Sequence, residues 1–203
     1  MDFSCILVEK RKFELIEFKN ALNLPEYSHA AHCCIYSRTS TQFKKYKSPA
    51  LVSMQMRFDG RLGFPGGKVG KGEDVLDAVN RELQEEINLN PKYSLKEENY
   101  LFTHTDSSRK TCFHFYSKEV SKADFEAIEK DTLQAEDYGI ETMGIIRVPL
   151  FTIKDGFRGF PAFLTNTFAG NSKSQLLGFL LHFNLITSEE IVTAVKSSKN
   201  PLF

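Results

Sequence analysis

The apolar positions between Glu73 and Ile87 recur at steps of three and four residues. They are Leu76, Val79, Leu83 and Ile87. This spacing places all of them on one face of an α-helix, where they can pack on a core. Acidic residues occupy the first turn, and Asn90-Pro91 ends the pattern, as is typical of helix ends. The pattern therefore predicts a helix over residues 73–87.

The rest of the chain mixes short apolar runs with capped helical patterns. Four runs rich in apolar, β-branched or aromatic residues predict strands, at residues 30–36, 51–57, 111–116 and 144–148. Two capping-box spacings, Ser172 with Gln175 and Thr187 with Glu190, predict two C-terminal helices, and a further helix is expected over residues 123–133. The polar run 37–42, which leads into the basic cluster 44–47, is expected to be a surface loop. This mixture predicts an α/β sandwich.

Length and composition narrow the class of protein. A chain of 203 residues suits one domain with terminal additions, and 41% hydrophobic with 26% charged residues is typical of a soluble globular protein rather than a membrane protein. Lys plus Arg equals Asp plus Glu, so the formal net charge is zero. Any affinity for RNA therefore has to be local.

The N-terminus and the cysteines bear on the compartment. Residues 1–10 carry an acid where a signal peptide has basic residues, and their apolar run is short, so we expect the segment to be retained and the protein not to be secreted. The cysteines are Cys5, Cys33, Cys34 and Cys112, and none has the C-x-x-C spacing of a zinc site. Because a disulfide framework is not indicated either, we expect a reducing compartment.

The predicted helix 73–87 carries an unusual group of acids. Glu82, Glu85 and Glu86 project from one face, and with Glu73 they make four negative groups that repel one another. Hard divalent cations such as Mg²⁺ or Mn²⁺ would offset that repulsion. Taken alone, the acids favour the simpler interpretation of a solvated helix face on which Arg81 makes weak surface pairs.

The segment before this helix favours the metal interpretation. Residues 63–72 form a Gly-rich loop that runs directly into the acidic helix. Glycines let the backbone approach a phosphate or a metal closely, so that carbonyls and amides can act beside the carboxylates. Loop and helix together predict a site for metal-assisted phosphate chemistry.

Loop and helix resemble the Nudix box, in which a Gly, five residues, a Glu and seven residues precede Arg-Glu-apolar-x-Glu-Glu-x-Gly. The match runs from Gly67 and Glu73 to Arg81-Glu82-Leu83-Gln84-Glu85-Glu86, and Asn88 replaces the final Gly. Asn tolerates the same left-handed conformation, so we expect the turn to be kept. The resemblance implies a Nudix fold, an α/β/α sandwich with a mixed central sheet. We expect one Nudix domain over residues 1–203, with the box at 67–89, an N-terminal extension at about 1–25 and C-terminal helices at about 172–198.

The same resemblance assigns roles to the box residues. It implies that Glu82, Glu85 and Glu86 carry Mg²⁺ or Mn²⁺, and that the carbonyl of Gly66 is an additional ligand. Arg81 and Glu73 would orient the helix and its acids. The metals would bridge a diphosphate, neutralise charge in the transition state and activate the attacking water. Which carboxylate acts as the general base stays open.

Further segments resemble one Nudix subfamily, the U8 snoRNA-decapping enzymes, also known as inosine diphosphatases. These segments are residues 54–67, 137–141, 147–150, 159–164 and 170–177, within a resemblance that covers 29–177. The loop 67–81 is one residue shorter than in that subfamily. The resemblance implies that His32, Arg57, Phe64 and Gln175 contact the nucleotide, and that His104 is an additional metal ligand.

Each of these residues also has a purely structural interpretation. His32 lies in an apolar strand, where a lone histidine is usually a hydrogen-bonded core residue, and Phe64 is either core packing or a stacking platform for a base. Arg57 either pairs with Asp59 or contacts phosphate, to which a guanidinium is well suited. Gln175 is equally well explained as a capping-box partner. The polar surroundings of His104 suggest an exposed, inert imidazole. The basic cluster 44–47 could also contact an RNA backbone, but solvated loops are commoner and we leave it outside the site.

Three functions follow for comparison. The first is a metal-dependent pyrophosphatase that hydrolyses the diphosphate bridge of 5′-capped RNA in the nucleus and cytoplasm. The second is a house-cleaning (deoxy)inosine diphosphatase that acts on free nucleotides. The third, a noncatalytic RNA-binding or scaffold protein, is disfavoured by the intact acids. The subfamily resemblance also implies a homodimer.

Overall fold

The computed structural model describes residues 13–199 and is organised around a mixed eight-stranded sheet with the strand order β1-β8-β9-β2-β5-β10. The strands are β1 (Glu14–Ile16), β2 (Ser28–Ser37), β5 (Leu51–Arg57), β6 (Leu62–Gly63), β7 (Gly66–Lys68), β8 (Tyr100–Asp106), β9 (Thr111–Glu119) and β10 (Thr142–Arg147). Off this path, β6 pairs with β5 and β7 pairs with β2. β2 and β9 are parallel, whereas the other pairs are antiparallel.

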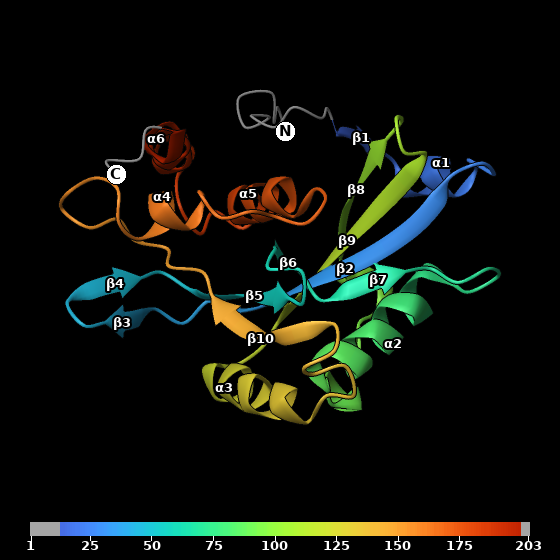
Figure 1. Ribbon diagram of the computed structural model, residues 1–203, viewed down its shortest axis with the longest axis horizontal. Coiled ribbons are helices and arrows are strands. Elements are labelled where there is room, and N and C mark those ends of the chain that lie inside the picture. The colour runs from blue at the N-terminus through green and yellow to red at the C-terminus, as the bar shows by residue number, and fades with distance from the viewer. Residues whose placement is uncertain (1–12, 200–203) are drawn as a thin grey trace.

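Helices cover both faces of the sheet (Figure 1). They are α1 (Phe18–Leu22), α2 (Val75–Ile87), α3 (Lys122–Asp131), α4 (Phe160–Phe163), α5 (Ser172–His182) and α6 (Ser188–Lys199), with 3₁₀ turns η1 (Pro91–Tyr93), η2 (Glu97–Asn99) and η3 (Thr132–Gln134). In Figure 1, α2 and α3 lie below the sheet, and α4, α5 and α6 lie above it. The predicted three-layer α/β/α arrangement with a mixed sheet is therefore confirmed.

Strand β2 connects the two layers of core because its side chains alternate between the faces of the sheet. Ala31, Cys33 and Ile35 pack with the apolar face of α2, whereas Cys34 and Tyr36 pack in the cluster that holds α5 and α6. The long hydrophobic run predicted at 30–36 is thus a strand that is buried on both sides.

Helix α2 forms for the reasons that its sequence suggests. The Asp74 side chain accepts a hydrogen bond from the Leu76 amide at 2.8 Å, which satisfies a free N–H at the helix start. Val79, Leu83 and Ile87 are fully buried. Asn88 ends the helix in the left-handed conformation, with φ of 50°. The substitution of Asn for the usual Gly therefore keeps the turn, as predicted.

Several local predictions were wrong. Residues 37–47 are not simply a loop, because β3 (Thr41–Phe43) pairs with β4 (Tyr46–Ser48) in a separate hairpin, whose turn contains Lys44 with φ of 54°. The Gly-rich segment includes strand β7, which is paired with β2. His104, expected in an exposed polar segment, lies in β8 with 7% of its surface exposed. In each case pairing with another strand overrides the local composition.

The capping boxes had different outcomes. At α6, the Thr187 hydroxyl and the Glu190 carboxylate exchange hydrogen bonds with each other's backbone amides, as predicted. At α5, the N-cap is Asn171 and Ser172 is already helical, so the predicted pairing of Ser172 with Gln175 is wrong. The Gln175 side chain turns into the protein interior and is completely buried.

Cys33, Cys34 and Cys112 are free and buried. Cys5 and the first 12 residues of the predicted N-terminal extension lie outside the described residues. Within residues 13–199, no helix is long and apolar enough to cross a membrane.

Candidate active site

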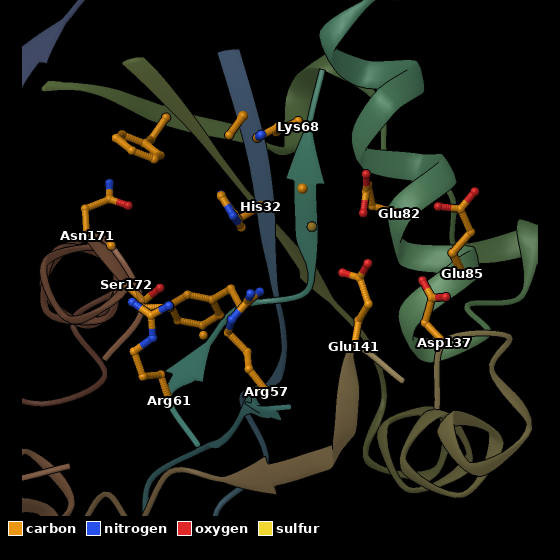
Figure 2. Close-up of a pocket in the computed structure, with 18 of the residues that line it drawn as sticks. His32, Arg57, Arg61, Lys68, Glu82, Glu85, Asp137, Glu141, Asn171 and Ser172 are labelled. Carbon is orange, nitrogen blue, oxygen red and sulfur yellow. The ribbon is translucent and has the colours of Figure 1, made fainter. Parts of the chain in front are cut away.

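A cavity of about 710 Å³ lies over β2 and β7, between α2 and the N-terminal end of α5. Its acidic wall consists of Glu82, Glu85, Asp137 and Glu141. Its basic residues are Arg57, Arg61, Lys68, Arg81 and Arg109, and Ala30 and His32 contribute to its floor. Figure 2 shows His32 on β2 between the acids on one side and Asn171 on the other. The cavity therefore combines carboxylates that can hold cations with guanidinium and ammonium groups that can hold phosphates.

Arg81 holds three box acids in place. Its Nε donates to Glu73 Oε1 at 2.9 Å, and its NH1 donates to Glu82 Oε1 at 3.0 Å and to Glu85 Oε2 at 2.8 Å. The Arg81 guanidinium and the Gly70 amide lower the pKa of Glu73. Arg81 and Glu73 therefore occupy the orienting positions that the resemblance implied.

Glu86 is the most buried of the box acids, with 1% of its surface exposed. The Gly66 amide donates to its Oε2 at 2.6 Å, and Gln55 Nε2 donates to its Oε1 at 3.1 Å. Burial raises the pKa of Glu86 to about 7, although both donors act in the opposite direction. Burial likewise raises the pKa of Glu82, against the effect of Arg81. Two carboxylates are thus held in surroundings that disfavour their charge.

Two glycines shape the backbone beside these acids. Gly66 has φ of 134°, and a β-carbon there would lie 2.2 Å from the Ala31 carbonyl oxygen. A β-carbon on Gly67 would lie 2.5 Å from atoms of the Glu82 carboxyl group. A side chain at Gly66 would push the strand away from the backbone of β2, and one at Gly67 would displace the Glu82 carboxyl group. The glycines therefore let β7 lie directly between its partner strand and the acids.

The donor chemistry of this region fits a hard divalent cation. Glu82, Glu85 and Glu86 supply carboxylate oxygens, and the Gly66 backbone lies beside them. As the side chains lie, no group of three or more His, Cys, Asp or Glu residues within 13–199 is close enough together to hold a metal. The same nitrogen of Arg81, NH1, pairs with both Glu82 and Glu85. Cation binding therefore requires these ion pairs to rearrange.

Two of the predicted nucleotide contacts, His32 and Arg57, line the cavity. His32 Nδ1 is buried and has no hydrogen-bond partner among the described residues. Burial, helped by the charge of Arg57, lowers the pKa of His32 to about 4, so the imidazole is neutral. Arg57 approaches Asp59 at 3.6 Å, which is too long for a strong ion pair and leaves its guanidinium available to phosphate.

Phe64 and Gln175 are buried more deeply than expected of substrate contacts. Phe64 borders the cavity, yet it is 1% exposed and packs edge-on against Phe115 at 4.9 Å between ring centroids. This arrangement favours core packing, and stacking by Phe64 stays a prediction. Both polar atoms of the Gln175 side chain are buried without a partner among the described residues, so an unmet hydrogen-bonding group lies behind the cavity.

His104 contacts the cavity through another residue. Its Nδ1 lies 3.1 Å from Nδ2 of Asn171, which lines the cavity. Burial lowers the pKa of His104 to about 4. A neutral imidazole in this position orients the Asn171 amide, whereas its predicted role as a metal ligand stays a prediction.

Sequence reasoning did not assign roles to several residues of the cavity. Glu141 and Asp137 come from the segment before β10, and Figure 2 shows both side chains directed towards the acids of α2. The Phe58 amide donates to the Glu141 carbonyl at 2.9 Å and fixes this segment to the end of β5. The segment 137–141 was one of those that resemble the subfamily, and that likeness was the signal that pointed to it. Gln55 lies within the resembling segment 54–67, but nothing in its own residue type singled it out.

Comparison with known families agrees with this geometry. The family model described as Nudt16-like, U8 snoRNA-decapping enzyme-like, matches residues 29–186. This chain belongs to that family. The intact box acids and the family together make it a Nudix hydrolase.

Proteins similar to this chain include two differently named groups, U8 snoRNA-decapping enzymes and Tudor-interacting repair regulator proteins. A U8 snoRNA-decapping enzyme of Homalodisca vitripennis is 51% identical over 74% of this chain and 82% of its own length. A protein of the same name from Xenopus laevis is 39% identical over 90% and 88%. A Tudor-interacting repair regulator protein of Homo sapiens is 36% identical over 86% and 82%.

A solved structure supports the fold. The MutT/nudix family protein from Enterococcus faecalis aligns with a TM-score of 0.51 at 13% identity, covering 90% of this chain and 70% of that protein. A likeness at this level of identity shows the Nudix fold alone.

Proposed function

We propose that this protein is a metal-dependent pyrophosphatase that hydrolyses the diphosphate bridge of 5′-capped RNA. It would release a capped nucleoside phosphate and a 5′-phosphorylated RNA. One observation supports this proposal. The acids of α2 lie in the same cavity as Arg57 and Arg61, with the neutral His32 between them. The names of the relatives agree with it.

In this proposal, each residue of the cavity has a role that follows from its chemistry. Glu82, Glu85, Glu86 and the Gly66 carbonyl would hold Mg²⁺ or Mn²⁺, which neutralises phosphate charge and lowers the pKa of a water when bound. Arg57 contacts a phosphate with its guanidinium. His32 presents a neutral ring nitrogen to the edge of a base. Glu73 and Arg81 would keep Glu85 oriented, and either Glu85 or Glu141, which points towards the acids of α2, would accept the proton of the attacking water.

The test is a substitution of Glu85. Glu85→Gln should lower turnover on capped RNA on the order of 10²-fold or more and leave RNA binding largely intact. The control Glu98→Gln changes an exposed acid in η2, away from the cavity, and should keep normal rates. Single-turnover rates with Mg²⁺, followed by reversible loss in EDTA, measure the effect. Normal turnover by Glu85→Gln, or full activity after exhaustive chelation, would contradict the proposal.

A second enzymatic function uses the same residues. A (deoxy)inosine diphosphatase would need a neutral hydrogen-bonding edge for hypoxanthine, and His32 provides one. Comparing capped RNA, inosine diphosphate and guanosine diphosphate with one protein preparation ranks the two functions. A noncatalytic role, which the name of the human relative suggests, is opposed by the retained acids. Metal-dependent turnover separates it from both.

The proposal includes a nuclear and cytoplasmic location and a homodimer. The names of the relatives suggest the nucleus, whereas the cytoplasmic location and the homodimer rest on the subfamily resemblance alone. Fluorescence imaging of the tagged protein and the mass in solution from light scattering test them.

A further inference from the structure

The floor of the cavity contains a row of three side chains that the predicted site did not include. β2 lies between β7 and β9, and the strand register places Lys68 opposite Ala30, and Ala30 opposite Phe113. Residues that lie opposite each other on neighbouring strands share a face of the sheet. All three line the cavity. Across the sheet, the row thus consists of the ammonium group of Lys68, the small methyl side chain of Ala30 and the aromatic ring of Phe113.

This row lies beside the proposed nucleotide contact but does not overlap it. His32 is two residues further along β2, opposite Gly66 and Phe115. Two residues span about 6.6 Å of strand, and two strand spacings separate the backbones of Lys68 and Phe113 by about 9.6 Å. Above the small Ala30 side chain there is room for a group next to the one that contacts His32. Figure 2 shows Lys68 near the β2 strand, across the cavity from Asn171.

Lys68 of this row and the neighbouring Arg109 are positively charged side chains that can contact a ligand. Lys68 is exposed and takes part in none of the ion pairs found between residues 13 and 199. Arg109, in the β8–β9 turn, also lines the cavity. Its guanidinium Nε lies 3.9 Å from the Asp106 carboxylate, and its backbone amide donates to Asp106 Oδ1 at 3.2 Å. Two positive side chains without close carboxylate partners in one part of a cavity favour a phosphate group.

The aromatic member of the row keeps part of its ring accessible. Phe113 is half-buried, and its ring packs perpendicular to that of Phe13 at 6.1 Å between centroids. Phe64, the residue expected to stack on a base, is buried. Phe113 thus combines a fixed ring with exposure to the cavity, which stacking on a base requires.

We propose that Lys68, Ala30 and Phe113, with Arg109 beside them, bind the second nucleotide of a substrate in which two nucleosides are joined through a polyphosphate bridge. Phe113 stacks on the second base, and Lys68 and Arg109 contact its phosphate. The inference rests on the proposed hydrolysis of a diphosphate bridge and narrows the substrate class. A free dinucleoside polyphosphate and the first nucleotide of a capped RNA present the same chemistry to this row.

The experiment compares the binding of one- and two-nucleoside ligands. GDP, the cap dinucleotide GpppG and a capped ten-nucleotide RNA are titrated calorimetrically with Mg²⁺ into Glu85→Gln protein, in which turnover is slow. Lys68→Met, Lys68→Arg and Phe113→Leu are added to this background, because Leu preserves the packing on Phe13 and removes the aromatic face. Lys71→Met is the matched control, since Lys71 is an exposed lysine three residues away that does not line the cavity.

We expect GpppG to bind more tightly than GDP by roughly tenfold or more, and both Lys68→Met and Phe113→Leu to reduce that ratio at least about fivefold. Lys68→Arg should restore the ratio and Lys71→Met should not change it. A ratio that is the same in all variants, or no preference for GpppG in the parent, would overturn the subsite. A loss confined to the capped RNA would also overturn it, because it would place the contact further along the chain.

The failure of the proposed function is measured separately. Wild-type hydrolysis of inosine diphosphate and of capped RNA with Mg²⁺ tests the hydrolase itself. If the protein cleaves inosine diphosphate but has no preference for GpppG, the proposed hydrolase activity is supported and the proposed subsite is overturned.

Discussion

Replacing Glu86 by glutamine removes a buried charge while it keeps the shape of the side chain. In the folded protein burial raises the pKa of Glu86 from its ordinary 4.5 to about 7, with a smaller contribution from Glu82 and an opposing one from Arg57. At ~1.4 kcal/mol per pKa unit, ionising Glu86 in the folded state costs roughly 3 kcal/mol. The neutral amide of the Glu86→Gln variant avoids that cost.

The pH window follows from the direction of this shift. Because the folded pKa lies above the unfolded one, Glu86 stabilises the protein fully below pH 4.5, and that contribution is lost as the pH rises through about 7. The gain from Glu86→Gln is therefore largest above pH 7. The amide oxygen of the variant side chain still accepts from the Gly66 amide. Its NH₂ group can donate to Gln55 Oε1, which has no partner among the described residues, once the Gln55 amide turns over.

Urea unfolding in EDTA at pH 5 and pH 8 measures this effect. We expect Glu86→Gln to raise the free energy of unfolding at pH 8 by about 1–3 kcal/mol, and by much less at pH 5. The same variant should lose turnover by about 10²-fold or more. Glu98→Gln, which changes an exposed acid, should leave both quantities unchanged. If the Glu86→Gln protein is less stable than wild type at pH 8, the ionised carboxylate does not lower the free energy of unfolding and the reasoning is refuted.

Three further outcomes are expected. Gly66→Ala should unfold at a lower temperature than wild type and lose activity, because its methyl group would collide with the Ala31 carbonyl; a normal melting temperature would contradict this close approach. Inosine and guanosine diphosphates should exceed adenosine diphosphate in kcat/KM by roughly ten- to hundred-fold, and His32→Ala should reduce that preference; equal rates for all bases would return His32 to a core role. As the pH falls from 6.5 towards 4, the depressed pKa values of His104 and His114, about 4 and about 3, should lower stability by about 1.4 kcal/mol per pH unit for each histidine. His114→Leu should show a shallower pH dependence in urea titrations, and an unchanged slope would exclude His114 as a source.

The sequence predicted the regular elements whose pattern is local. Residues 51–57 and 73–87 correspond closely to β5 and α2, since strong hydrophobic periodicity and a capping Asp74 determine them within one segment. The strands β1, β6, β7 and β8 were not predicted. β1, β6 and β7 are only two or three residues long, and they are strands because a partner strand is already in place. β8 pairs with β1 and β9.

The site was predicted in part for the same reason. The spacing of Glu82, Glu85 and Glu86 is a property of one helix, so their common face follows from sequence. Glu141 and Gln55 approach the same acids from the segment before β10 and from β5, and only the order of strands in the sheet brings them there. Burial was the least predictable quantity, as Phe64 and His104 show, because it depends on what covers a residue and not on its neighbours in the chain.

The ion pairs of Arg81 have a consequence for how the protein matures. Glu73, Glu82 and Glu85 share one guanidinium, which offsets much of their mutual repulsion without a cation. Under the proposed metal-dependent mechanism, these ion pairs would let the chain fold without its cation, in contrast to small domains that fold only around their ion. Binding of Mg²⁺ to the folded protein would then displace the Arg81 side chain from Glu82 and Glu85.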